Sequence, residues 1–243
     1  MRTLILSDIH ANLTALKSVL ADAGPFDQVW CLGDIVGYGP DPNECVTLIQ
    51  SLSPLKCVKG NHDAAILGEI DLRVFNYEAR DSLLWLRNKL EPQHLQWLNT
   101  LEERLVFDDV TMVHGSPRNP IWEYLMDTVS AGENMSAFST QLCFVGHTHV
   151  PGVFQFNDDK IGSTDYYAMT DGSEFIPENK VIINPGSVGQ PRDNDPRSSY
   201  VVFDNQTNRF EFHRVKYNIE QVQKRILAAG LPRRHASRLE NGW

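Results

Sequence analysis

Short, continuous apolar runs alternate with segments of helical spacing over the first sixty residues. The runs at residues 3–6 and 29–32 are too uniformly apolar for half-exposed strands, so we expect strands covered on both faces. Residues 12–20 and 41–52 each place apolar side chains along one helical stripe, behind a residue that favours the N-cap. A third strand is predicted at residues 56–59. This order of strands and helices indicates an α/β beginning with parallel strands.

The rest of the chain is helical at first and then rich in strands. Residues 64–101 carry leucines and tryptophans at helical spacing, which predicts two helices with a break near Glu91-Pro92. Strands are predicted at residues 105–107, 110–113, 142–145, 181–183 and 200–203, and a last helix near residues 219–229. We expect the basic tail at residues 230–243 to be a solvated end. The chain is thus predicted to be a single domain, residues 1–243, of two face-to-face sheets with helices outside and a helical insertion at 64–101.

Composition narrows the classes of partner and compartment. The chain has 243 residues, 42% of them hydrophobic and 22% charged, which is typical of one folded domain. It lacks the apolar run of about eighteen residues that a membrane span needs and the pattern of a leader, so we expect a cytoplasmic protein with no membrane partner. The net charge of -9, from 22 basic and 31 acidic residues, makes nucleic acid an improbable partner. The four cysteines form no Cys-x-x-Cys pair and are predicted to be buried free thiols.

Asp, Asn or His residues follow five of the apolar runs, at the point where each predicted strand ends. Open α/β sheets bind their ligands at this edge. One histidine after a strand is more often a cap or a satisfied polar group, but five segments of this kind would repel one another without cations. The residues are Asp8 and His10; Asp34; Asn61, His62 and Asp63; His114; and His147 and His149.

The chemistry of these side chains favours particular metals. They offer carboxylates, imidazoles and one amide but no thiolate, which suits Mn, Fe, Zn, Ni or Co better than a cysteine-bound zinc or a calcium cage. Seven of these residues are candidate metal ligands, which is more than one ion can hold while keeping a coordination position open. Two divalent ions that share Asp34 fit better, and ion pairs about 3.5–4 Å apart are typical of phosphoester displacement.

The motifs resemble those of a known family, the calcineurin-like metallophosphoesterases, and in particular its smaller bacterial and archaeal members. The matching segments are Asp8-Ile9-His10, Gly33-Asp34, Gly60-Asn61-His62-Asp63, His114 and Gly146-His147-Thr148-His149. The resemblance covers about residues 3–150 and extends loosely through a late loop at residues 183–189. It implies a four-layered α/β/β/α sandwich of two mixed sheets flanked by helices.

The resemblance also implies a role for each residue. One metal ion would be held by Asp8, His10 and His149, the other by Asn61, His114 and His147, and Asp34 would bridge them. His62 matches the position that stabilises or protonates the leaving oxygen, and Asp63 matches the residue that orients it. The implied reaction is hydrolysis of a phosphoester by a hydroxide that bridges the two ions, with a contribution of about 10²–10⁴-fold from His62.

Departures from the family indicate the kind of substrate. Protein phosphatases of the family carry Asp-Arg-Gly after the second motif, and residues 33–40 of this chain lack it. This favours small phosphodiesters, nucleotides or nucleotide polyphosphates. The alternatives are a phosphomonoesterase, a Ser/Thr protein phosphatase on the same site, or a non-catalytic metal-binding interaction module; a nuclease is disfavoured by the acidic charge. Arg118 and Arg192 are candidates to reach a substrate phosphate. The helical segment 64–101 and the loops at residues 117–122 and 161–178 are expected to shape the pocket.

Overall fold

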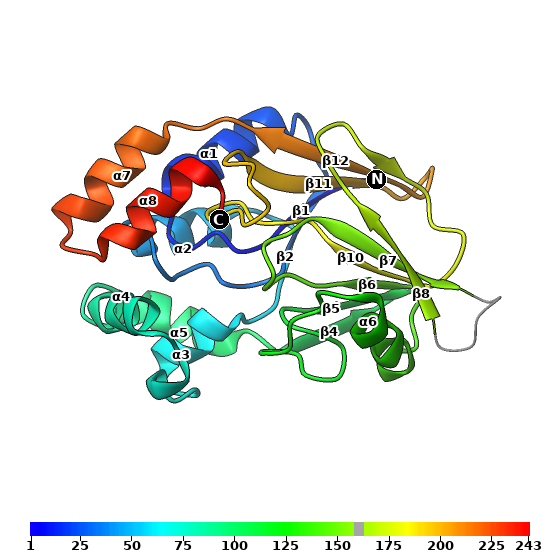
Figure 1. Ribbon diagram of the computed structural model, residues 1–243, viewed down its shortest axis with the longest axis horizontal. Helices are drawn as coiled ribbons and strands as arrows, with labels where there is room; N and C mark the ends of the chain where they lie inside the picture. The colour runs from blue at the N-terminus through cyan, green and yellow to red at the C-terminus, as the bar shows by residue number, and fades with distance from the viewer. Residues whose placement is uncertain (158–162) are drawn as a thin grey trace.

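Two mixed, six-stranded sheets form the centre of the molecule in the computed structural model, which describes residues 1–157 and 163–243 (Figure 1). The first sheet has the order β3-β2-β1-β11-β12-β9, and the second has the order β4-β5-β6-β10-β7-β8. The strands of the first sheet are β1 (Arg2–Leu6), β2 (Gln28–Cys31), β3 (Leu55–Cys57), β9 (Glu174–Phe175), β11 (Ser198–Asp204) and β12 (Arg209–Val215). Those of the second are β4 (Arg104–Phe107), β5 (Val110–Val113), β6 (Leu142–Phe144), β7 (Gly152–Asn157), β8 (Ser163–Ala168) and β10 (Val181–Asn184).

Parallel pairing brings the ends of several strands to one edge. Strands β1, β2 and β3 are parallel, with Leu6 opposite Cys31 and Cys31 opposite Cys57. In the second sheet β5, β6 and β10 are parallel to one another. The loops after β1, β2, β3, β5 and β6 therefore leave from carboxyl ends, which is where the sequence places its candidate ligands.

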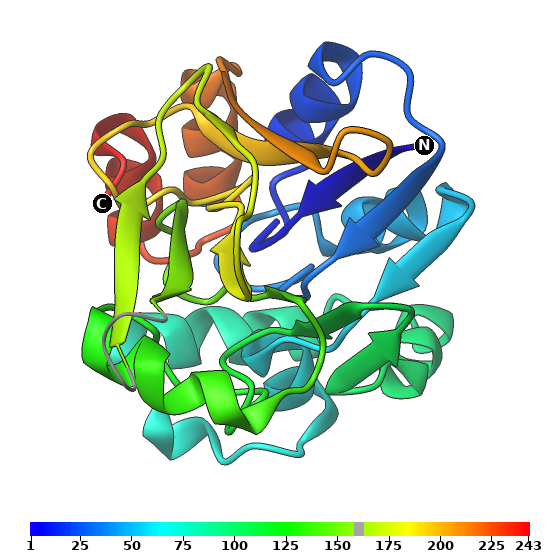
Figure 2. The same ribbon diagram turned by 90° about the vertical axis from the view of Figure 1, so that its right-hand side faces the viewer.

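Helices cover the outer faces of both sheets. The helices are α1 (Leu13–Asp22), α2 (Pro42–Ser51), α3 (Asn61–Leu67), η1 (Leu72–Val74), α4 (Tyr77–Arg87), α5 (Pro92–Thr100), α6 (Thr128–Asn134), η2 (Met135–Ala137), α7 (Ile219–Ala228) and α8 (Arg233–Asn241). Figure 2 shows α1 and α7 on one side of the sheets and α6 on the opposite side. The order helix, sheet, sheet, helix confirms the predicted four-layered sandwich.

The apolar runs are buried on both faces, as their composition predicts. On β1, Ile5 points into the core between the two sheets, where it joins Trp30, Phe144 and Phe210. Its neighbours Leu4 and Leu6 point the other way and pack with the helices. Because side chains alternate along a strand, only a continuous apolar run can fill both layers at once.

Two predicted segments have different boundaries in the structure. Helix α3 begins at Asn61, three residues before the predicted helical segment, and so contains Asn61, His62 and Asp63. The break at Glu91-Pro92 is confirmed, because Pro92 begins α5. The expectation of a pocket-shaping loop at residues 161–178 is wrong from Ser163 onward, where β8 and β9 lie and line no part of the cavity described below; residues 161–162 lie outside the described part.

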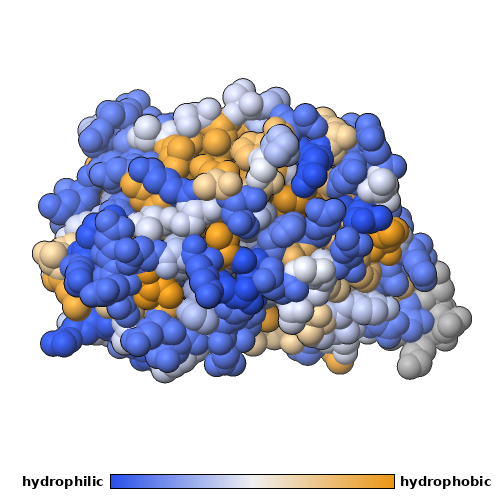
Figure 3. Space-filling model, turned by 90° about the horizontal axis from the view of Figure 1, so that it is seen from above, coloured by the Kyte–Doolittle hydropathy of each residue, from blue (hydrophilic) through white to orange (hydrophobic). Residues whose placement is uncertain are grey.

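The basic tail is not a solvated end, which corrects the prediction. Its residues form α8, whose His235, Ala236 and Leu239 are buried, and Ala236 and Leu239 pack against Val222 and Ile226 of α7. The spacing of these side chains puts them on one side of the helix, and Arg233 and Arg234 are exposed whereas Arg238 is half-buried. The described helices include none with the length and apolarity to cross a bilayer. The face seen from above is mostly hydrophilic, with separate hydrophobic groups (Figure 3).

Candidate metal centre

The five predicted segments meet at one place, and their backbones are strained there. Five of the candidate ligands have a left-handed backbone, a conformation that non-glycine residues rarely adopt and that costs on the order of 1–3 kcal/mol each. Strain of this kind persists only where the surrounding structure enforces it, and it is concentrated at functional sites. The φ angles are 53° at Asp8, 49° at His10, 51° at Asp34, 66° at His147 and 62° at His149.

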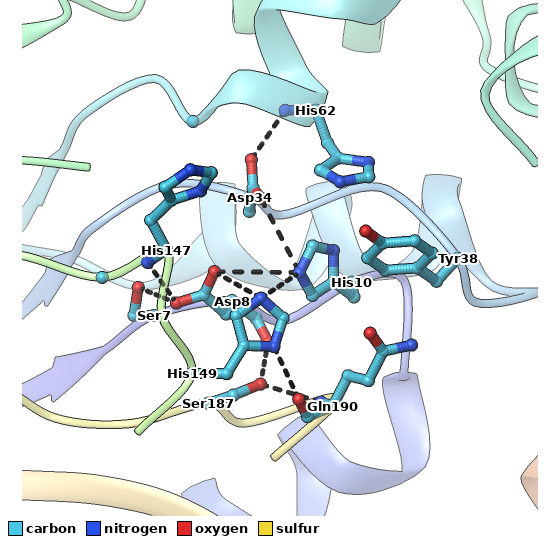
Figure 4. Close-up of polar contacts among 12 residues, drawn as sticks. Ser7, Asp8, His10, Asp34, Tyr38, His62, His147, His149, Ser187 and Gln190 are labelled. Atoms are coloured by element: carbon cyan, nitrogen blue, oxygen red, sulfur yellow. Dashed lines mark hydrogen bonds and ion pairs between the residues drawn. The ribbon is translucent and has the colours of Figure 1, made fainter. Parts of the chain in front are cut away.

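Asp8, His10 and His149 form the first group of donors (Figure 4). The Nε2 atoms of His10 and His149 lie 3.1 Å apart. Asp8 Oδ1 is 3.2 Å from His149 Nε2 and 3.7 Å from His10 Nε2, is fully buried and has no hydrogen-bond partner. Its other oxygen, Oδ2, accepts hydrogen bonds from Ser7 Oγ and the backbone amide of His147. Three donor atoms thus converge with one carboxylate oxygen left unsatisfied.

Asn61, His114 and His147 form the second group. His114 Nε2 lies 3.0 Å from Asn61 Oδ1 and 3.2 Å from His147 Nδ1. All three side chains are buried, with exposed fractions of 3% or less. The group therefore offers one amide oxygen and two imidazole nitrogens to a common point.

Asp34 lies between the two groups. Its Oδ2 is 3.7 Å from His10 Nε2 in the first group and 3.3 Å from His114 Nε2 in the second. Its Oδ1 accepts a hydrogen bond of 2.8 Å from the backbone amide of His62, which fixes the carboxylate. One carboxylate therefore reaches both groups.

Backbone carbonyls set the tautomers of the four histidines. Each ring has one nitrogen within hydrogen-bond distance of a backbone carbonyl, which can only accept, so that nitrogen carries the proton. The opposite nitrogen then turns a lone pair toward the centre. The contacts are His10 Nδ1 to Val36, His149 Nδ1 to Gln190, His114 Nδ1 to Leu32 and His147 Nε2 to Trp122. Lone pairs facing each other at 3.1–3.2 Å need a cation between them, so the residues fit metal ions.

The pKa shifts of these residues also fit a site for cations. Burial raises the pKa of both Asp8 and Asp34, but the neighbouring histidines outweigh it and hold both well below the usual range. Burial lowers the pKa of His10 and His149, and it lowers that of His147 to about 3. The exception is His114: burial lowers its pKa, but Asp34 raises it more, to about 9. This rise reflects the close contact of 3.3 Å between His114 Nε2 and Asp34 Oδ2.

His62 and Asp63 differ from the ligands in their contacts. Burial lowers the pKa of His62 to about 4, and its Nδ1 has no hydrogen-bond partner. The carboxylate of Asp63 accepts hydrogen bonds from the backbone amides of Gly60, Ile35 and Val36. Asp63 thus ties the loop after β2 to the start of α3, and it bears on His62 through the backbone rather than through the imidazole ring.

Two glycines let the loop after β2 lie against the histidines. A Cβ on Gly37 would come within 2.6 Å of the His62 ring, and one on Gly39 within 2.2 Å of the His10 carbonyl. Between them, Tyr38 packs its ring 4.6 Å from that of His10 and 4.5 Å from that of His62. Tyr38 is not among the candidate residues that the sequence predicts. A large residue between two glycines was the available signal.

A cavity of about 230 Å³ opens onto the metal centre. The ligands Asp34, Asn61, His147 and His149 line it together with His62, and so do side chains that the sequence analysis did not single out: Tyr38, Phe75, Trp122 and Tyr124. Phe75 belongs to the segment 64–101 and Trp122 to the loop 117–122, and both segments are expected to shape the pocket, as they do. Tyr124 comes from a segment with no local pattern that marks it as part of a site.

The two candidate arginines have different positions. Arg192 lines the cavity. Arg118 does not, because it forms ion pairs of 2.5 Å with Glu123 and 2.6 Å with Glu133. Ser187 donates a hydrogen bond of 2.8 Å to the Asp8 carbonyl and so supports the first loop.

Comparison with known proteins assigns the family. The model of the calcineurin-like phosphoesterase superfamily domain matches residues 1–208. The chain belongs to that superfamily. Membership makes it a hydrolase that acts on phosphoesters, and the metallophosphoesterase family implies divalent metal ions. The donor sets described above fit such ions.

Similar proteins agree with this assignment. A metallophosphoesterase from Sphaerobacter thermophilus has a crystal structure that matches with a TM-score of 0.92 and 48% identity, over 100% of this chain and 99% of that one. The uncharacterized protein MJ0912 of Methanocaldococcus jannaschii is 39% identical over 237 residues, 94% of this chain and 93% of that protein. A symmetrical bis(5'-nucleosyl)-tetraphosphatase of Proteus mirabilis is 35% identical over 104 residues, 40% of this chain and 37% of its own length.

Proposed function

We propose that the chain hydrolyses small phosphodiesters, nucleotides or nucleotide polyphosphates with two divalent ions of the Mn, Fe, Zn, Ni or Co type. The observation that carries this proposal is the pair of donor groups on either side of Asp34. Asp8, His10 and His149 would hold one ion, and Asn61, His114 and His147 the other, with Asp34 shared. Bound ions of this kind lower the pKa of coordinated water and neutralise phosphate oxygens.

His62 would act on the leaving oxygen. Its ring faces the cavity beside Tyr38, and Nδ1 is free of any protein partner. Since burial lowers its pKa to about 4, the imidazole is neutral near pH 7, and it would offer an N–H as a hydrogen-bond donor. Asp63 would keep His62 in place by fixing the backbone at Gly60.

The size of the site favours small substrates. A cavity of about 230 Å³ lies below the range of about 300–1,000 Å³ that holds drug-sized ligands. A folded phosphoprotein would have to insert its phosphorylated side chain past Phe75 and Trp122. The similarity to a nucleosyl-tetraphosphatase is in keeping with a nucleotide-like substrate.

All four cysteines are free and buried, which agrees with action in the reducing cytoplasm.

The test is turnover of bis-p-nitrophenyl phosphate by protein loaded with Mn, Ni or Co. We expect hydrolysis that a chelator abolishes and that added metal restores. The variant His114→Asn should lose activity, whereas His213→Asn, on the surface of β12, should retain it. Folded protein that turns over no phosphoester with any of these metals would refute the proposal. Parallel assays with p-nitrophenyl phosphate and a phosphopeptide separate the monoesterase and protein-phosphatase alternatives.

A non-catalytic interaction module is the second candidate on this scaffold. Such a module needs no complete ligand set and no free imidazole beside it. Here every position of both donor groups is filled and His62 has an unpartnered nitrogen, which favours catalysis.

A further inference from the structure

Six ring side chains surround the cavity in an unbroken series of contacts. The ring centroids are 4.5 Å apart from Tyr38 to His62, 5.2 Å from His62 to Phe75 and 5.1 Å from Phe75 to Trp122. They are 6.0 Å apart from Trp122 to His147, and 3.9 Å from His147 to Tyr124. Two of the six, His62 and His147, belong to the candidate metal centre. The other four have no role in the proposed hydrolysis.

Arg192 closes this series of rings. Its Nη2 lies 3.4 Å from the hydroxyl of Tyr38, and its positive charge opposes the rise that burial causes in the pKa of Tyr124, at the other end of the series. In the order of contacts Arg192 therefore stands opposite the pair Phe75 and Trp122. It is also close enough to the metal centre to lower the pKa of His62 and His149.

Arg192 has no anionic partner in the described part of the chain, and its buried Nε has no hydrogen-bond acceptor. Its Nη2 also donates a hydrogen bond of 3.1 Å to Gln190 Oε1, which is a neutral acceptor. A half-buried cation of this kind is costly unless an anion joins it. Arg118, the other arginine that the sequence marks as a candidate, differs because it already forms ion pairs with two glutamates.

Phe75 and Trp122 provide an apolar surface on the opposite side. Their rings meet at 90°, so each keeps a face that the other does not cover. Both side chains are half-buried and line the cavity. Planar aromatic groups, nucleobases included, stack on such rings with a gain of about 5–150-fold in affinity per base.

We propose that this site binds phosphoesters that carry a planar aromatic group, with Arg192 on a phosphate oxygen and the aromatic group against Phe75 and Trp122. The proposal rests on the proposed function and names its substrate class. Arg192, Phe75 and Trp122 line the same cavity as four of the candidate metal ligands, so one ligand with its phosphate at the metal centre can contact both the arginine and the aromatic pair. The cavity of about 230 Å³ has room for a phosphate and one ring system.

The test measures binding rather than turnover, with phosphonates that cannot be hydrolysed. Metal-loaded protein is titrated calorimetrically with phenylphosphonate, cyclohexylphosphonate and methylphosphonate. We expect phenylphosphonate to bind at least about fivefold more tightly than the other two. Equal affinity for phenylphosphonate and cyclohexylphosphonate would overturn the aromatic part of the proposal, because hydrophobicity alone would then account for binding.

Variants assign the two ends of the site. Arg192→Met should weaken binding of all three phosphonates by about 10–100-fold, and Arg192→Lys should recover part of the loss. The matched control Arg209→Met, on β12, should change nothing. Trp122→Leu and Phe75→Leu should remove the preference for phenylphosphonate and leave methylphosphonate unaffected, while Tyr167→Leu should keep the preference. Wild-type affinities in Arg192→Met would overturn the role of the arginine.

Two further ligands identify the source of the aromatic group. AMP and ribose 5-phosphate are compared in the same titration, and the samples are checked for released phosphate. Tighter binding of AMP points to a nucleotide, and equal binding points to a simple aryl ester; both keep the shared chemistry. Phosphonate binding without any ester hydrolysis would refute the proposed function alone, whereas hydrolysis without an aryl preference would refute only this inference.

Discussion

Replacing Gly60 by alanine perturbs the metal centre without removing any ligand. A Cβ at this position would lie 2.1 Å from Asp34 Oδ1 and 2.3 Å from Asp34 N. Ordinary contacts begin at 3.4 Å, so Asp34 or α3 must retreat by about 1.3 Å. The φ angle of Gly60 is -94°, which alanine adopts freely, so the effect comes from this contact and not from the backbone of Gly60.

The size of the effect follows from that displacement. Asp34 reaches both donor groups, and its Oδ1 also holds the amide of His62. A shift of about 1 Å at a reacting centre costs roughly 10²-fold in rate, or about 2.7 kcal/mol. We therefore expect Gly60→Ala to lose about 10²-fold in kcat on bis-p-nitrophenyl phosphate and to retain less metal after desalting.

The control is Gly172→Ala. Gly172 has a φ of +78° and nothing within 4 Å of its added Cβ, so alanine there costs about 1–2 kcal/mol of backbone strain and leaves the site intact. Metal content by mass spectrometry, kcat and thermal unfolding are measured for both variants. Wild-type metal content and kcat in folded Gly60→Ala would show that the position of Asp34 between the two donor groups does not control metal binding or catalysis.

Four further outcomes are expected. His62→Ala should keep its metal ions and lose about 10²–10⁴-fold in kcat, whereas Asp34→Asn should lose metal as well; equal metal loss in both would contradict the assigned roles. Chelation should lower Tm by about 5–10 °C, because a ligand at 100 times its Kd adds about 2.7 kcal/mol of stability, and an unchanged Tm would argue against tight sites. Burial lowers the pKa of His235 to about 4, from about 6.5 for an unperturbed histidine. Since the unfolded chain binds that proton first, the contribution of His235 is full above pH 6.5 and falls by about 3 kcal/mol toward pH 4, so the free energy of unfolding of His235→Leu should depend less on pH over that window.

The first half of the fold and the candidate ligands could be predicted because their signals are local. A continuous apolar run followed by Asp8 and His10 identifies both a buried strand and its functional end. The same holds for Asp34 and for His147. Parallel pairing then brings these ends together with no further information.

The rest depended on contacts between distant segments. Phe75, Trp122 and Arg192 come from three parts of the chain, and only packing makes them walls of one cavity. The composition of the α8 segment predicts a solvated end because its arginines are prominent, while its buried side has three residues. Strand β12 was missed although its residues alternate between buried and partly exposed, because Arg214 occupies one of the buried positions.

Anomalous scattering from crystals of the manganese-loaded protein tests the central claim most directly. We expect two peaks per chain. One peak should lie among Asp8, His10 and His149, and the other among Asn61, His114 and His147. Asp34 should contact both. A single peak, or one bound by His62 in place of either group, would contradict it.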